Sequence, residues 1–263
     1  MLGLTNHPLP LPRGELVREL RNWTKMSDTK AHTGEQYRID IPTAIDRAEL
    51  VKFFKVERTR PMMEKYLDEV IAIAQPVIQA KGLYRLASVG TKSDDWVEIE
   101  GVKFHSKVLS KSLANIETVV PYLVTSGKEL DDLPIPPSDR MRYYCLDLIK
   151  MQVVFQAIGY FMNYLKEKFS YPEVTHLHPG EFADLGIDAQ VPLFSLFHDT
   201  GSAIGLILTP NKTLSPVKSG SGILFYNGSS FVSCELCLQA HCPGRHAAYN
   251  PKLAEKFGIG VKK

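Results

Sequence analysis

Three of the four cysteines in the 263-residue chain lie within nine residues of one another, at Cys234, Cys237 and Cys242. Spacers of two and four residues let successive thiolates converge on one point, which is typical of a metal centre. Disulfide pairing is the weaker interpretation, because a chain of this length buries enough core without cross-links and nothing in it indicates an oxidising compartment. We therefore predict a metal centre in a cytoplasmic protein.

The cysteine spacing indicates where a metal would bind but leaves more than one metal possible. Cys-x2-Cys suits both iron–sulfur clusters and zinc, but zinc ribbons usually supply two such pairs, and this chain supplies one. Pro243 follows Cys242 directly, as in cysteine runs that bind ferredoxin-type clusters. Backbone amides of the turn at Pro243 and the charge of Arg245 would suit a thiolate-bound cluster. The sequence favours an iron–sulfur cluster, in particular 4Fe-4S, and leaves zinc or metal-free thiols as alternatives.

The fourth ligand has several candidates. A four-iron cluster takes four thiolates, so the remaining cysteine, Cys145, is the first of them. A cysteine in an apolar helix is often only a small buried hydrophobic residue, and His241, His246 or an exchangeable ligand are the other options. The predicted metal ligands are Cys145, Cys234, Cys237 and Cys242.

Composition narrows the classes of partner. The chain is 44% apolar and 23% charged with a net charge of +2, so we expect a soluble globular protein that binds neither nucleic acid nor a membrane surface. No apolar run reaches the length of a membrane span, and no signal peptide opens the chain. A homo-oligomer is compatible with this composition. No nucleophile elbow, zinc-protease motif or phosphate loop is present, so the sequence assigns no catalytic residue.

The order of strands and helices predicted along the chain indicates the α+β class. We expect an N-terminal extension over 1–38, a single domain over 39–230 and a cysteine-rich, cluster-binding tail over 231–263. The domain should hold a mixed or antiparallel sheet and a long central helix. Strands are expected at 39–41, 83–89, 96–99, 102–104, 118–125, 203–209 and 221–225, and helices at 46–54, 61–77, 106–115, 140–169, 188–197 and 251–257.

Four of these elements carry specific predictions. The helix over 140–169 is apolar nearly all round and should be buried at the centre. The run 118–125 suits a buried strand, although Pro121 argues against complete pairing. Glu100 and Gly101 should form a hairpin turn. The helix that begins at Pro61 should share one apolar face among Met62, Tyr66, Val70, Ile73, Ala74 and Val77.

A polar segment over 175–185 follows the predicted central helix. Loops in such a place often carry sites, although each residue could equally serve as a turn or cap residue. The segment contains His176, His178, Pro179, Gly180, Glu181 and Asp184.

With these residues in place, the chain resembles a known family. Tyr-Leu-Val-Thr-Ser-Gly over 122–127, Pro179-Gly180 and the Gln190-Val-Pro-Leu-Phe-Ser-Leu run are similar to the activation domain of cobalamin (vitamin B12)-dependent methionine synthase. The hairpin over 96–104, the long helix, and the segments 204–209 and 219–222 resemble it as well. The similarity covers roughly residues 39–226 and is strongest to the shorter, stand-alone bacterial members, a subset of which carry a similar cysteine-rich tail.

The resemblance implies a role in reactivation. Such domains bind S-adenosylmethionine and present it, with an electron from a separate donor, to a corrinoid whose cobalt is in the inactive Co(II) state. It implies a corrinoid protein or cobalamin-dependent methyltransferase as partner. The cofactor-binding residues it implies are His176, Pro179, Gly180, Glu181 and Gln190.

The chain departs from the family pattern at three places. In the family's Arg-x-x-Pro-Gly-Tyr motif, His176 stands in the place of the arginine and Glu181 in that of the tyrosine. Thr209-Pro210-Asn211 stands where the family has Thr-Glu-Ser. A neutral histidine offers one donor where arginine offers two, so we do not carry the family's hold on the methionine carboxylate over to this chain.

Together the cysteines and the resemblance predict an iron–sulfur protein that reductively activates a corrinoid-dependent methionine synthase or methyltransferase, or acts as its accessory subunit, by delivering an electron to Co(II) corrinoid. One alternative is a zinc-stabilised module that recognises a corrinoid protein without chemistry. Another is an S-adenosylmethionine-binding methyltransferase subunit. Whether the chain is itself part of an enzyme, as a methyltransferase component or a corrinoid reductase, stays open.

Overall fold

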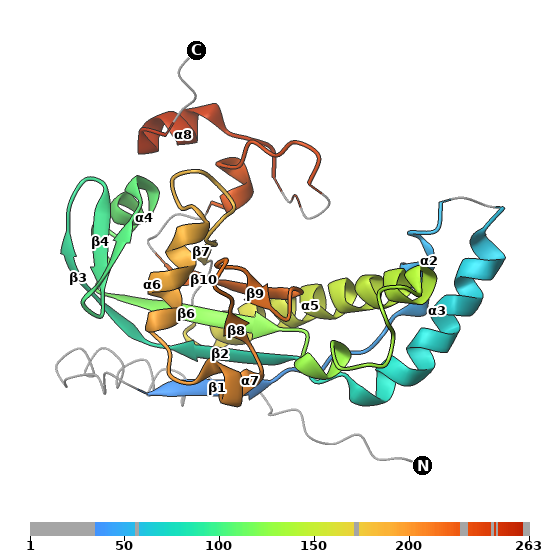
Figure 1. Cartoon of the computed structure of the whole chain (residues 1–263). Coiled ribbons are helices and arrows are strands. Elements are labelled where there is room, and N and C mark those ends of the chain that lie inside the picture. The colour runs from blue at the N-terminus through green and yellow to red at the C-terminus, as the bar shows by residue number, and fades with distance from the viewer. Residues whose placement is uncertain are drawn as a thin grey trace. The chain divides into compact units, whose positions relative to one another are not determined.

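The computed structural model describes residues 35–55, 58–170, 174–226, 231–242, 245 and 247–259. The chain divides after Gly34, and every element described below belongs to the unit that begins at Glu35 (Figure 1). The predicted extension lies outside the described residues except for residues 35–38. Pro243, Gly244 and His246 lie outside them as well.

An eight-stranded antiparallel sheet forms the centre of this unit. Six strands follow the order β1-β2-β6-β3-β4-β5, and β10 pairs with both β6 and β7. The strands are β1 (Gln36–Asp40), β2 (Lys81–Arg85), β3 (Ala87–Lys92), β4 (Trp96–Ile99), β5 (Val102–His105), β6 (Thr118–Thr125), β7 (Thr175–Leu177) and β10 (Ser219–Phe225), with a separate pair β8 (Ile207–Leu208) and β9 (Leu214–Ser215).

Helices cover the sheet, and side-chain caps begin several of them. Asp46 and Asp139 each accept a hydrogen bond from the backbone of the helix that follows. The helices are α2 (Arg47–Val51), α3 (Arg60–Ala74), α4 (Lys107–Ser112), α5 (Arg140–Lys168), α6 (Gln190–Ser195), α7 (Thr200–Ile204) and α8 (Pro251–Phe257), with 3-10 turns η1 (Gln75–Val77), η2 (Lys128–Leu130), η3 (Ile187–Ala189) and η4 (Ser233–Glu235). The predicted α+β class, with an antiparallel sheet and one long helix, is confirmed.

Strand β6 separates two hydrophobic cores because its side chains alternate between the two faces of the sheet. Val119 and Leu123 face the first core, which also contains residues of α4, α6 and α8. Val120, Tyr122 and Val124 face the second, which contains the buried residues of α2, α3 and α5. The sheet is therefore covered on both faces, so every residue of β6 after Thr118 is buried.

Pro121 interrupts the pairing of β6 on one side, which confirms that this strand is not completely paired, although it lies in the centre of the sheet. On one side Pro121 lies opposite Ile223 of β10. On the other side β2 pairs with β6 up to Tyr84, and β3 resumes the pairing at Ala87 in the same register. The residue without an N–H therefore lies where the partner changes from β2 to β3, and a central strand tolerates it.

Two helix faces differ from the prediction. In α3 the buried residues are Met63, Leu67, Val70 and Ala74, whereas Met62 and Ile73 are 47% and 40% exposed. The apolar stripe is shifted by one residue because apolar side chains flank it on both sides. Helix α5 is buried on one side only, and Phe155 on the other is 53% exposed.

Helix α5 also bears on the question of a membrane. Among the described residues it is the one helix whose length and composition would allow it to cross a bilayer, so the expectation that no run reaches that length was wrong. Half of its most apolar stretch is buried inside the protein, where α5 runs beside α3 (Figure 1). The core helix of a globular domain has the same properties.

Several boundaries differ from the predicted ones for local reasons. The run 203–209 is not a strand: Asp199 caps α7, and only Ile207–Leu208 pair as β8. The segment 83–89 divides into β2 and β3 at Leu86, and 175–177 form β7 rather than a loop. Asp188 does not cap a helix but forms an ion pair with Lys212. The turn at Glu100 and Gly101, both with positive φ, is confirmed.

The C-terminal segment packs into the first core. Phe231, Leu236, Ala254 and Phe257 are buried there, and the rings of Phe231 and Phe257 lie 5.4 Å apart. Helix α8 contacts α4, and the Lys111 ammonium donates to the carbonyl of Phe257 at 3.1 Å. The thiols therefore lie on a segment anchored at both of its ends.

Candidate functional site

The three C-terminal thiols lie on one loop that begins at η4. Cys234 and Cys237 are half-buried and Cys242 is exposed. The loop is fixed at its start because the Ser233 hydroxyl donates to the carbonyl of His176 at 2.9 Å. It is fixed near α8 because the Asn250 amide donates to the carbonyl of Glu235 at 2.8 Å.

A single guanidinium holds the interior of this loop. Arg245 Nη1 donates to the carbonyls of Cys234 at 3.2 Å and Ala247 at 2.6 Å. Its Nη2 donates to the carbonyls of Cys237 at 2.7 Å and Gln239 at 3.1 Å, and Nε donates to Gln239 at 3.2 Å. Arginine has five N–H groups, so every donor of Arg245 has a carbonyl of its own loop.

The loop has one feature of a thiolate site but does not form a closed one. The Gln239 amide donates to Cys237 Sγ at 3.5 Å, as backbone amides do to metal-bound sulfur. All four cysteines are free thiols. Within the described residues, no group of three or more histidine, cysteine, aspartate or glutamate side chains is arranged to hold a metal ion.

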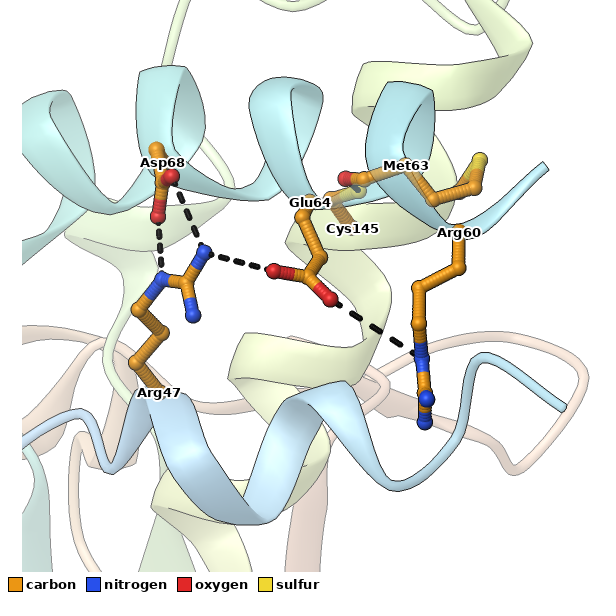
Figure 2. Close-up of polar contacts among 6 residues, drawn as sticks. All are labelled: Arg47, Arg60, Met63, Glu64, Asp68 and Cys145. Atoms are coloured by element: carbon orange, nitrogen blue, oxygen red, sulfur yellow. Dashed lines mark hydrogen bonds and ion pairs between the residues drawn. The ribbon is translucent and has the colours of Figure 1, made fainter. Parts of the chain in front are cut away.

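Cys145 lies in the second core, between α5 and α3 (Figure 2). Its Sγ is 4.0 Å from the carbonyl of Met63, and burial raises the pKa of this thiol to about 11. A raised pKa disfavours the thiolate that a metal ligand must supply. Its surroundings thus favour the alternative of a small buried hydrophobic residue, and its role as fourth ligand stays a prediction. His241 is exposed, and His246 lies outside the described residues.

A second polar cluster is connected to the thiol loop, because the Ser233 hydroxyl donates to the carbonyl of His176. His176 belongs to β7 and His178 follows it, so their side chains lie on the same face of an extended segment. His176 Nδ1 lies 2.7 Å from His178 Nε2, and His178 Nδ1 lies 3.0 Å from the carbonyl oxygen of Ser221 in β10. The Ser221 hydroxyl donates to Gln190 Oε1 at 2.9 Å, which brings α6 into the same network.

The hydrogen-bond partners assign the protons of the histidine pair. A carbonyl can only accept, so His178 Nδ1 carries a hydrogen. Burial lowers the pKa of His178 to about 4, more than its bond to Ser221 raises it, so Nε2 is unprotonated at neutral pH and accepts. His176 Nδ1 must then be the donor to it.

Tyr122 completes the cluster from β6. Its hydroxyl lies 3.3 Å from His178 Nε2 and 3.4 Å from His176 Nδ1. Burial raises the pKa of Tyr122 well above its ordinary value, and the charge of Glu181 raises it further, so the hydroxyl stays protonated. Gly222 makes room for it, because a Cβ there would lie 2.8 Å from the Tyr122 oxygen and 2.7 Å from the carbonyl of Leu177.

The predicted site residues occupy different roles in this arrangement. His176 and Gln190 belong to the polar network, whereas Pro179 is buried and Glu181 is exposed. Gly180 has a φ of 93° and donates from its backbone to Leu185 at 2.8 Å, so it serves the turn. Whether these residues bind a cofactor stays a prediction.

Asp184, the remaining acidic residue of the segment, assists the cap of α4, whose N-cap residue is Ser106. It accepts from the Ser106 hydroxyl and from the backbone amides of Lys107 and Val108 at the start of α4. This confirms the cap alternative for that residue.

Sequence reasoning missed His178, Tyr122 and Ser221 as members of the cluster. The two-residue spacing of His176 and His178 was a usable signal, because it places both on one face of a strand. The contribution of Tyr122 and Ser221 depends on the pairing of β10 with both β6 and β7, which the sequence does not encode in a local pattern.

Comparison with known proteins identifies a similar fold. No family model matches the chain, and no curated protein matches it. Among solved structures, the crystal structure of the MetH reactivation domain bound to AdoHcy is similar, with a TM-score of 0.53 and 14% sequence identity. The match covers 76% of this chain and 81% of that one. At this identity the likeness establishes the fold: the chain has a fold similar to that of the MetH reactivation domain.

Proposed function

We propose that this protein is an accessory subunit that docks against a corrinoid-dependent methionine synthase or a related methyltransferase and supports the reactivation of its cobalt. The observation that carries the proposal is the fold, which is similar to that of a reactivation domain over most of both chains. The sequence resemblance over residues 39–226 independently names the same family. Protein partners in such a role would be corrinoid proteins.

The histidine cluster is the proposed ligand-facing part of the fold. It lies on the segment 176–181 that the resemblance aligns with the family's ligand-binding motif. The similar structure binds AdoHcy, so an adenosylated sulfur compound is the first ligand to test. The Nδ1 hydrogen of His176 is donated to His178, so it is not available to a ligand. We therefore expect a weaker hold on a carboxylate than an arginine would give.

The finer proposal is that Cys234, Cys237 and Cys242 hold an iron–sulfur cluster. When bound, such a cluster would supply the electron that Co(II) needs. Three soft thiol donors on one anchored loop, with the Gln239 amide already directed to a sulfur, suit a metal–thiolate centre. Because the described thiols are not gathered into a closed site, the loop would close around the metal as it binds.

Metal analysis tests the centre. Anaerobically purified protein should contain iron and sulfide in matching amounts, and Ala substitution of Cys234 or Cys237 should remove both. The same counts on Cys145→Ala decide the fourth ligand, since unchanged iron would exclude Cys145. One zinc per chain without iron would instead support the zinc-stabilised module.

Docking and nucleoside binding are tested separately. Analytical ultracentrifugation of the full chain with a corrinoid-loaded methionine synthase that lacks its own reactivation domain should reveal a complex. If the two sediment independently at micromolar concentrations, the accessory role is refuted. Calorimetric titration with AdoHcy then distinguishes the S-adenosylmethionine-binding subunit, for which tight binding is expected.

A further inference from the structure

Among the described residues, the Arg245 guanidinium donates only to carbonyls of the loop that carries the thiols. Its five N–H groups contact the carbonyls of Cys234, Cys237, Gln239 and Ala247 at 2.6–3.2 Å. The positive charge of Arg245 therefore interacts with backbone oxygens inside the loop. The sequence suggested instead that it offsets the charge of a bound cluster.

Directing these carbonyls to one side directs amides to the other. A trans peptide is planar, so the N–H that follows a carbonyl points away from it. The carbonyls of Cys237 and Gln239 point to the guanidinium, hence the amides of Leu238 and Ala240 point away from it. The Gln239 amide between them donates to Cys237 Sγ. The guanidinium therefore fixes the backbone on both sides of the amide that contacts Cys237 Sγ.

We infer that Arg245 is the positioning residue of the thiol loop: its fork of donors fixes the backbone that carries Cys234 and Cys237, and with it the Gln239 amide that donates to Cys237. The inference deepens the proposed metal centre at these thiols and assigns Arg245 no contact with the metal. A geometric role of this kind requires the planar five-donor fork, whereas a purely electrostatic role requires only a positive charge.

The test compares Arg245→Lys, which keeps the charge and loses the fork, with Arg245→Gln and with the wild-type full chain. Each metal-free protein is treated with iodoacetamide, and mass spectrometry measures the alkylation rate at each cysteine. We expect rates at Cys234 and Cys237 to rise at least about tenfold in both variants, because several charge-assisted hydrogen bonds are lost. Cys145, buried in the other core, should not change.

Lys252→Met is the matched control, since it removes an exposed positive charge from α8 and should leave all rates unchanged. Wild-type rates in Arg245→Lys would overturn the inference, because charge alone would then suffice. If Cys145 also reacts faster, the variant has unfolded as a whole and its alkylation rates do not test the inference. Hydrogen exchange on the wild-type chain then tests whether the thiol loop is pre-folded. Protected amides over 234–240 support the inference, and exchange at the rate of a free peptide overturns it.

The metal supplies a second readout. Reconstitution with iron and sulfide should give at least about tenfold weaker loading in Arg245→Lys than in the wild type. If the wild-type chain binds no metal, the proposed centre fails while the alkylation rates still decide the role of Arg245. If the wild type and Arg245→Lys load equally, the centre stands and the inference fails.

Discussion

The buried imidazole of His178 should make the stability of the protein depend on pH in a defined window. Its pKa falls from an ordinary 6.5 to about 4 in the folded chain, mainly through burial. Between these values the unfolded chain binds one more proton than the folded chain, so the free energy of unfolding falls as the pH is lowered. Each pKa unit corresponds to about 1.4 kcal/mol, which gives a loss of about 3 kcal/mol between pH 7 and pH 4.

The substitution His178→Gln isolates this contribution. At pH 7 the variant should be less stable by about 1 to 3 kcal/mol, because hydrogen bonds to Ser221 and His176 are lost. As the pH falls, the wild type bears the cost of a buried imidazole that resists protonation, and the variant does not. The stability advantage of the wild type should therefore shrink by about 3 kcal/mol toward pH 4, which cancels or reverses it.

Urea denaturation at pH 7, 6, 5 and 4.5 measures the difference. The window separates His178 from Asp68, Asp139 and Asp199, whose pKa values lie below the ordinary 3.8 and whose contribution to stability is lost only at lower pH. His105→Gln, on the exposed side of β5, is the control and should parallel the wild type. An equal pH dependence in the wild type and in His178→Gln would refute the neutral, buried state of His178 and the proton assignment built on it.

Two further substitutions test the packing around the site. Gly222→Ala should lower the free energy of unfolding by about 2 to 4 kcal/mol in thermal or urea melts, since its Cβ would lie 2.7 Å from the carbonyl of Leu177; Gly159→Ala, with open space around the Cβ, should be neutral or stabilising. Asp184→Ala should cost about 1 to 2 kcal/mol through the loss of its hydrogen bonds to the start of α4, and a change within error in the same melts would contradict that role.

Elements with a strong local signal could be predicted from the sequence. The hairpin at Glu100 and Gly101, the caps at Asp46 and Asp139, and helix α8 after Asn250 each depend on residues near one another in the chain. Their physical causes are turn conformation and helix capping, which act over two to four residues.

Predictions failed, or missed the physical cause, where the deciding partner is distant in sequence. The incomplete pairing expected at Pro121 is confirmed, but its cause, the change of partner from β2 to β3, lies in residues distant in sequence. The apolar run at 203–209 reads as a strand, but Asp199 caps a helix at its start and only two residues find a pairing partner. Propensity cannot decide such cases, because tertiary contacts override it.

The candidate site was predictable in part for the same reason. The spacing of the C-terminal cysteines indicated the loop. The role of Arg245 depends on four backbone carbonyls, and because every residue has one, the sequence does not show which of them accept. The sequence pointed to His176. The role of its partner His178 depends on a hydrogen bond to the carbonyl of Ser221, which lies on another strand.

The proposed role in reactivation is tested most directly by the cobalt itself. A methionine synthase without its own reactivation domain is poised in the Co(II) state, supplied with S-adenosylmethionine and a chemical reductant, and followed by electron paramagnetic resonance with and without this full chain. The account predicts that the Co(II) signal disappears and methyl transfer resumes only when the chain is present. A signal that persists equally in both samples, while the intact synthase recovers under the same conditions, would contradict it.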